Sequence, residues 1–233
     1  MKLSKTFITL LLFTAGNVTL AKANKVDRHL SSFHAVNVAG SFDVVIKQGS
    51  TESVVVDAPA DVINYVITEV SNGSLKIYTR NNQGWKNLFS NKRIVVYVNI
   101  KTVDAISLTG SGDVSFKDGV TANLLKLALT GSGNVMGKIT AKSLDASITG
   151  SGDVNVWGHA NDSKVSITGS GDYSGDKLTT ASTSASIGGS GDITVHASEN
   201  LQARISGSGD IHYSGNPKNV IKSKSGSGDI SSN

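Results

Sequence analysis

The sequence predicts an all-β protein, folded as a right-handed parallel β-helix (a β-solenoid) with coils of about 19 residues. Two observations carry this prediction: a recurring tetrapeptide, and apolar residues that alternate with polar ones on both of its sides. The tetrapeptide is Gly-Ser-Gly-Asp or Gly-Ser-Gly-Asn, and it recurs at spacings of 18 to 21 residues. Its seven copies span residues 110–113, 131–134, 150–153, 169–172, 189–192, 207–210 and 226–229.

The flanks of each tetrapeptide predict strands with one buried face. Ala146 and Ile148 precede one copy at alternate positions, and Val154 follows it. Third short segments are expected around Leu125, Leu144, Leu201 and Val220. Three short strands and their corners in about 19 residues fit one solenoid coil, because a propeller blade requires about twice that length.

Backbone sterics explain why the corners are rich in glycine. Glycine tolerates positive φ, so two glycines around a serine permit a sharp and repeatable bend. The following Asp or Asn can accept hydrogen bonds from nearby backbone N–H groups. Asn134 replaces Asp in one copy, which indicates that the corner requires a side-chain oxygen and not a charge.

Residues 1–23 are predicted to be a signal peptide. Lys2 and Lys5 precede an apolar run, and Ala21-Lys22-Ala23 has the small-x-small pattern of a cleavage site. Cleavage after Ala23 removes three lysines and no acid, so the formal net charge falls from +4 to +1. The mature chain is therefore expected to be periplasmic or secreted, without a transmembrane segment and without a nucleic-acid partner.

One domain is expected over residues 24–233, because no linker separates its two parts. Residues 24–100 form an irregular β-rich start, with a degenerate corner at 40–43 and a short helix at 59–66. Residues 101–233 form the seven coils. Further strands are expected at 36–46, 53–57, 74–78 and 93–100.

The last coil departs from the apolar pattern. Lys222 and Lys224 occupy the two positions that hold apolar residues in earlier coils. Charges at a terminal coil block pairing between ends, so this coil is interpreted as a cap. The alternative is sequence drift in a frayed tail.

Residues 80–93 form a basic segment without an acid, and aromatic side chains lie among its charges. One interpretation is a contact loop for an anionic surface or glycan. The alternative, which burial of apolar residues favours, is a hairpin whose aromatics fold back onto the end of the solenoid. The candidate contact residues are Arg80, Trp85, Lys86, Phe89, Lys92 and Arg93.

Stacked coils would align the corner carboxylates along one edge, where neighbouring charges repel one another. A Ca²⁺-binding edge would relieve this repulsion, since hard cations take oxygen ligands. The alternative is that each carboxylate closes its own turn, and Asn134 favours it by interrupting the row. The residues of this cation edge would be Asp113, Asp153, Asp172, Asp192, Asp210 and Asp229.

Catalysis is not predicted, and no catalytic residue, metal site or cofactor is assigned. A catalytic site requires a singular cluster, whereas regular coils place the same residue everywhere. The chain has no cysteine, which excludes disulfides and thiolate chemistry, and its five histidines lack metal-ligand spacing.

Residues 39–43 (Ala-Gly-Ser-Phe-Asp), residues 72–77 (Asn-Gly-Ser-Leu-Lys-Ile) and the run of corners carry a family resemblance. Over about residues 29–230 the chain resembles the head GIN domain family of auto-transporter adhesin-like bacterial proteins. The resemblance implies a right-handed β-helix, export and an adhesin-like role. No barrel strands follow the coils, so self-export in the manner of true autotransporters is not expected.

The leading hypothesis is an exported, non-enzymatic β-helix of the cell envelope that binds a glycan or an envelope protein. The alternatives are a carbohydrate-active enzyme on the same scaffold and a Ca²⁺-binding structural repeat protein. Side-by-side homo-oligomers are also compatible with a prism-shaped molecule.

Overall fold

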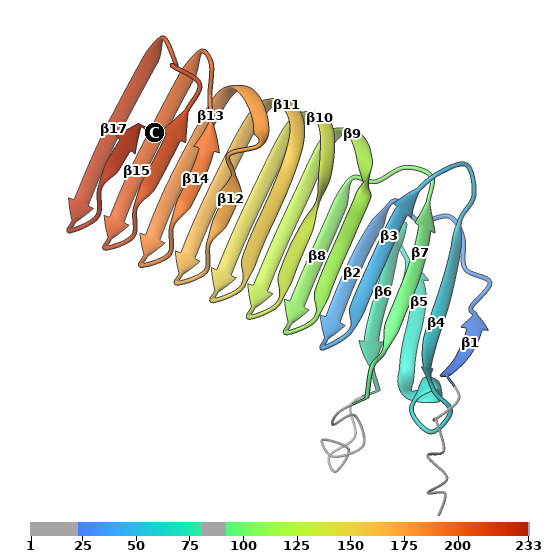
Figure 1. Ribbon diagram of the computed structural model, residues 1–233. Coiled ribbons are helices and arrows are strands. Elements are labelled where there is room, and N and C mark those ends of the chain that lie inside the picture. Colours follow the sequence, from blue (N-terminus) through green and yellow to red (C-terminus); the bar gives the residue numbers. More distant parts are fainter. Residues whose placement is uncertain (1–22, 81–91, 233) are drawn as a thin grey trace, which may run out of the picture.

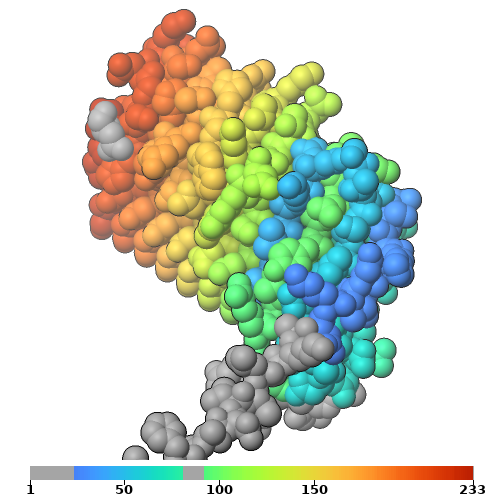
Figure 2. Space-filling view, turned by 45° about the vertical axis from the view of Figure 1, so that its right-hand side comes forward, coloured from blue at the N-terminus to red at the C-terminus, as the bar shows by residue number. Residues whose placement is uncertain are grey.

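The computed structural model describes residues 23–80 and 92–232, which form a β-solenoid (Figure 1). From residue 105 on, successive coils stack in sequence order along one axis, as the succession of colours shows (Figure 2). In each coil a strand runs into a sharp corner, another leaves it, and a rounded turn closes the opposite edge. We call the sheet of strands that run into the corners the upstream face, and the sheet of strands that leave them the downstream face.

The repeating strands pair in parallel, position by position, so that Gly131, Gly150 and Gly169 stand in register. This arrangement confirms the predicted fold class. The strands are β8 (Ala105–Gly110), β9 (Asp113–Gly131), β10 (Asn134–Gly150), β11 (Asp153–Gly169), β12 (Tyr173–Gly175), β13 (Leu178–Gly189), β14 (Ile193–His196), β15 (Asn200–Gly207), β16 (Ile211–Ser214), β17 (Asn219–Gly226) and β18 (Ile230–Ser232).

The predicted third segment of each coil is wrong. Strands β9, β10 and β11 each run without interruption from one corner to the next. Leu125 belongs to the same upstream stretch as Leu127 and Leu129, and all three side chains are buried. Each coil thus contributes to two faces, not three.

Additional strands extend both faces beyond the first corner. They are β1 (Ala23–Asp27), β2 (Ala35–Gly40), β3 (Asp43–Gln48), β4 (Ser53–Pro59), β5 (Val66–Ser71), β6 (Ser74–Thr79) and β7 (Val95–Ile100). On the upstream face β2 lies between β8 and β6, and β5 pairs antiparallel with β6. On the downstream face β3 lies between β9 and β7, followed by the antiparallel strands β4 and β1.

Strands β6 and β7 belong to a coil of their own. Tyr78 of β6 pairs with Ala39, and Val95 of β7 pairs with Asp43. Thr79 and Ile94 therefore lie level with the corner residues 40 and 42 of the neighbouring coil. The described ends of the basic segment thus lie at the corner edge of the solenoid.

The helix expected at residues 59–66 is reduced to one 3-10 turn, η1 (Ile63–Tyr65). The segment only has to cross from β4 on the downstream face to β5 on the upstream face. Arg28 holds this crossing in place, because its guanidinium donates to the carbonyl oxygens of Ile63 and Val66 at 2.8 and 3.2 Å.

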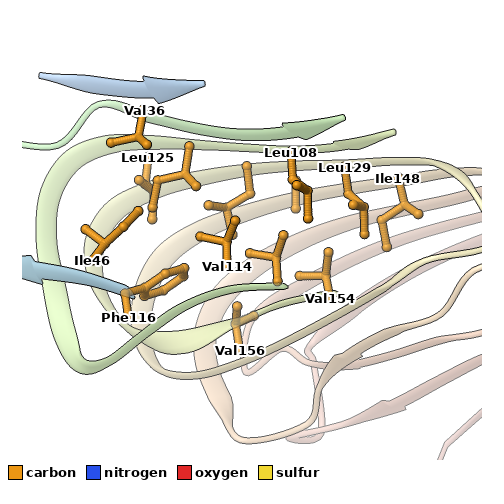
Figure 3. Close-up of a cluster of buried hydrophobic side chains, with 14 of the residues drawn as sticks. Val36, Ile46, Leu108, Val114, Phe116, Leu125, Leu129, Ile148, Val154 and Val156 are labelled. Atoms are coloured by element: carbon orange, nitrogen blue, oxygen red, sulfur yellow. The ribbon is translucent and has the colours of Figure 1, made fainter. Parts of the chain in front are cut away.

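Two layers of apolar side chains meet between the faces and form the core (Figure 3). Leu108, Leu129 and Ile148 stack in a column on the upstream side. Large and small residues compensate each other on the downstream side. A Cβ atom at Gly137 would lie only 2.0 Å from the ring of Phe116, so glycine makes room for that ring.

The last coil is ordered and paired with the coil before it, so it is not a frayed tail. Strand β17 pairs in register with β15, and Lys222 and Lys224 stand opposite the inward residues Ala203 and Ile205. The Lys222 ammonium donates to the carbonyl oxygen of Ile230 at 2.9 Å, and that of Lys224 donates to Gly228 at 3.2 Å. The Lys222 side chain therefore reaches from the upstream face to the downstream face over the open end of the core, and that of Lys224 reaches the corner.

Candidate functional site

The corners form a hydrogen-bonded edge along the solenoid. The N–H groups of Ser151 and Gly152 both donate to the carbonyl oxygen of Gly131, at 2.9 and 3.0 Å. The N–H of Asp153 donates to Gly133 at 3.1 Å. The same pattern of donation from one corner to the corner below it recurs along the stack. The conspicuous tetrapeptide is therefore explained by architecture.

The corner carboxylates bind the next coil and not their own turn. Four of them accept a hydrogen bond from the backbone N–H of the aspartate that follows in the column. The acceptors are Asp153, Asp172, Asp192 and Asp210, at 2.7 to 3.0 Å. Asp113 instead accepts from the side-chain amide of Asn134 at 2.8 Å. Among the described residues no cluster of three or more His, Asp or Glu side chains could hold a metal ion.

Replacing Asp192 by Asn is expected to change stability by less than about 0.5 kcal/mol, whereas replacing it by Ala is expected to cost about 1 kcal/mol. Asn retains an oxygen for the N–H of Asp210, which donates at 2.8 Å, and Ala does not. Thermal unfolding of both variants, with and without Ca²⁺, measures the difference. A stabilisation by Ca²⁺ that disappears in Asp192→Asn would instead support the cation edge.

Only the base of the basic segment lies within the described residues, since Trp85, Lys86 and Phe89 fall outside them. Its remaining candidates are Arg80, Lys92 and Arg93. The N–H of Arg80 donates to the carbonyl oxygen of Tyr65 at 3.1 Å. Lys92 makes an ion pair with Asp61, and Arg93 lies 4.0 Å from a carboxylate oxygen of Asp43. The hydrogen bond from Lys92 lowers the pKa of the Asp61 carboxyl from its ordinary value. Acids that are distant in the sequence thus compensate the base of this segment.

An exposed apolar row crosses the downstream face beside that base. Pairing places Val55 of β4 opposite Tyr97 of β7, and Tyr97 opposite Val45 of β3. The row continues through Ser115 of β9 to Met136 of β10. Tyr97 is 39% exposed and Val45 is 37% exposed, which is unusual for large apolar side chains on a polar sheet surface.

Charged residues flank the apolar row on both sides, two residues away along β3 and β9, whereas β4 and β10 each carry a charge on one side only. The acidic row lies toward the corners and the basic row toward the rounded turns. The acidic row consists of Asp57, Asp43 and Asp113, and the basic row consists of Lys47, Lys117 and Lys138. We call the three rows together the downstream site.

An open hollow of about 260 Å³ lies over the downstream site. All three rows line it, through residues that include Asp43, Asp113, Val45, Tyr97, Met136 and Lys117, and Arg93 joins them from the basic segment. An aromatic ring beside carboxylates and cations can hold a sugar, whose apolar ring face packs on the aromatic and whose hydroxyls donate to carboxylates. The arrangement is therefore suited to binding a saccharide.

Sequence reasoning missed most of this site, since only Asp113 and Arg93 were candidates. The sequence indicates only that Val45, Tyr97 and Met136 occupy outward positions of strands with alternating burial. Their meeting depends on β7 and β9 pairing with opposite edges of β3, a register that no local pattern specifies.

No helix in the part of the chain that the structure describes has the length and apolar character needed to cross a membrane.

Solved structures confirm the fold. A putative adhesin from Bacteroides fragilis aligns with a TM-score of 0.83 and 24% identity, covering 91% of this chain and 97% of that one. A putative lipid binding protein from Parabacteroides distasonis aligns with a TM-score of 0.72 and 26% identity, covering 92% and 98%. A putative adhesin from Parabacteroides merdae aligns with a TM-score of 0.71 and 20% identity, covering 92% and 97%.

A search of curated proteins gives no match to this chain. A family model, in contrast, matches residues 32–217, which is most of the sequence. The model is described as "Putative auto-transporter adhesin, head GIN domain". The chain therefore belongs to the head GIN domain family of auto-transporter adhesin-like proteins.

Proposed function

We propose that this protein is an exported, non-enzymatic binding module of the bacterial cell envelope that holds a glycan at the downstream site. The observation that carries the proposal is the row of Val55, Tyr97, Val45 and Met136 between acidic and basic rows, in which Tyr97 and Val45 are exposed. The adhesin-like description of the family supports a binding role.

Export is part of the proposal, with the mature protein in the periplasm or the medium. Strand β1 begins at Ala23, the residue after which cleavage is expected. Cleavage there leaves Asn24 to Asp27 paired with β4. Removal of residues 1–23 is thus compatible with the pairing of β1 and β4. Cell fractionation with amino-terminal sequencing of the mature protein tests both the route and the cleavage point.

The binding role is tested by a panel of bacterial and plant polysaccharides, measured for binding and for release of new reducing ends. We expect binding without turnover. Tyr97→Ala is expected to weaken binding about tenfold, because the ring supplies the apolar platform. Tyr78→Ala is the matched control, since Tyr78 is half-buried and lies opposite Ala39 on the upstream face.

Two results would contradict the proposal. In the first, the protein depolymerises a polysaccharide and Asp43→Asn or Asp113→Asn abolishes this activity, which would favour a carbohydrate-active enzyme. Equal losses of binding in Tyr97→Ala and Tyr78→Ala would show that the downstream site is not the binding surface.

A further inference from the structure

The basic row of the downstream site forms a line across three neighbouring strands. Lys47 lies on β3, Lys117 on β9 and Lys138 on β10. Val45 of β3 stands opposite Ser115 of β9, two residues before Lys47 and Lys117. Phe116 stands opposite Gly137, and the register of β9 and β10 then shifts, so that the Lys138 side chain lies beside Gly119. Neighbouring strands are about 4.8 Å apart, so the three lysines lie on successive strands along the solenoid axis.

The basic row is poorly neutralised by the protein itself. Lys47 lies 3.6 Å from Asp118, but the two side chains are 65% and 70% exposed, so water screens this pair strongly. Lys117 and Lys138 make no ion pair within the described residues. Neighbouring ammonium groups repel one another, and an anionic ligand would relieve that repulsion.

The acidic row does not supply the missing counter-charges, because its members have other partners. Asp57 lies 3.8 Å from Lys25, and Asp43 lies 4.0 Å from Arg93. Asp113 accepts the amide of Asn134 at 2.8 Å. These carboxylates also lie on the far side of the apolar row. A ligand that fits both sides must therefore carry anions on one edge and hydroxyl donors on the other.

Aromatic side chains extend the apolar surface beside the lysines. Trp157 of β11 is half-buried and stands opposite Lys138. Its ring therefore lies in line with the basic row, in the next coil. Together with Tyr97, over whose ring the Lys25 ammonium lies 5.3 Å from the centroid, it offers two aromatic rings on strands separated by β3, β9 and β10. A ligand that uses both must be extended along the axis.

We propose that the downstream site binds a linear polysaccharide of uronic acid units that lies along the solenoid axis. Its carboxylates lie on Lys47, Lys117 and Lys138, and its hydroxyls face the acidic row. This inference rests on the proposed glycan-binding function and specifies its ligand. Polymers that are anionic along both edges, such as polyphosphate, fit less well because the acidic row repels them.

The experiment measures binding of polygalacturonate, of the neutral polymer dextran and of polyphosphate to the full mature chain. The test variant carries Lys47→Gln, Lys117→Gln and Lys138→Gln. The matched control carries Lys126→Gln, Lys142→Gln and Lys164→Gln, which remove the same charge from exposed positions outside the downstream face. We expect the test variant to bind polygalacturonate at least about 30-fold more weakly, and the control less than about threefold more weakly.

Added salt should weaken polygalacturonate binding to the unmodified protein and have little effect on the test variant. Equal losses in the two triple variants, or stronger binding of polyphosphate than of polygalacturonate, would overturn the inference. If dextran is the only polymer bound, and Tyr97→Ala still weakens its binding, the inference about uronic acids is overturned and the proposed function stands. Absence of binding to every polysaccharide would overturn both.

Discussion

Replacing Gly152 by Ala is expected to destabilise the solenoid by about 3 kcal/mol or more. An added Cβ would lie 2.2 Å from the carbonyl oxygen of Gly133 in the coil below, far inside van der Waals contact. Gly152 does not have a positive φ, so the cost comes from this close approach alone. Relief would require the two coils to move apart, which would break the bond from the Gly152 N–H to Gly131. Urea unfolding followed by circular dichroism measures the loss.

Gly188→Thr is the matched control for this prediction. Gly188 lies directly before a corner, and an added Cβ would have only the carbonyl oxygen of Ile167 nearby, at 3.7 Å. Earlier coils carry Thr149 and Thr168 at the same position. We expect the control to be neutral or slightly stabilising, because Thr suits a strand better than Gly. An unchanged midpoint for Gly152→Ala would show that the second corner glycine is not required by stacking.

The corners could be predicted from the sequence because each of them is a local device. The two glycines and the oxygen-bearing residue lie within four positions of the sequence. The regular spacing between successive corners then sets the length of each stacked coil. The bond made by Asp192 could not be predicted in the same way. Its partner, the N–H of Asp210, comes within reach only after two coils have stacked, so the expected bond within one turn was replaced by a bond between turns.

The rounded turn within β10 was harder to predict because neither Gly nor Pro marks it. Strand β10 passes through residues 141–143 without Gly or Pro, and its burial alternation shifts there by one position. The sequence consequently suggested a separate third segment around Leu144. In the structure Leu144 is the first of three inward residues of the upstream stretch, followed by Ala146 and Ile148.

The downstream site depends on which strands meet at the first coils, and this is a property of the topology. Residues 49–94 separate β3 from β7 and β8, yet β8 returns to pair with β2 and β9 returns to pair with β3. The apolar row exists only because of this return. A surface built in this way has no local sequence pattern, whereas the core columns repeat in every coil.

Replacing Lys222 by Leu and Lys224 by Ile is expected to convert the capped end into an association surface. Both positions face inward on β17, in register with Ala203 and Ile205, so the substitutions continue the apolar columns to an open end. All residues of β17 are exposed, and its outer edge offers unpaired backbone groups for another strand. Burial of two aliphatic side chains contributes about 1.5–3 kcal/mol each, which raises the association constant about 100-fold or more. Sedimentation velocity over a range of concentrations measures this self-association.

The matched control places the same two changes, Lys126→Leu and Lys164→Ile, on the upstream face away from the end. Both of these side chains are exposed, so the control adds equal apolar surface without opening a strand edge. Since apolar surface alone lacks the directional pairing of β17, we expect association only in the variant of the last coil. If that variant sediments like the unmodified protein at every concentration, the bonds from Lys222 to Ile230 and from Lys224 to Gly228 stabilise the last coil without blocking contact between ends. If both variants associate equally, surface hydrophobicity governs assembly and the lysines are not a specific cap.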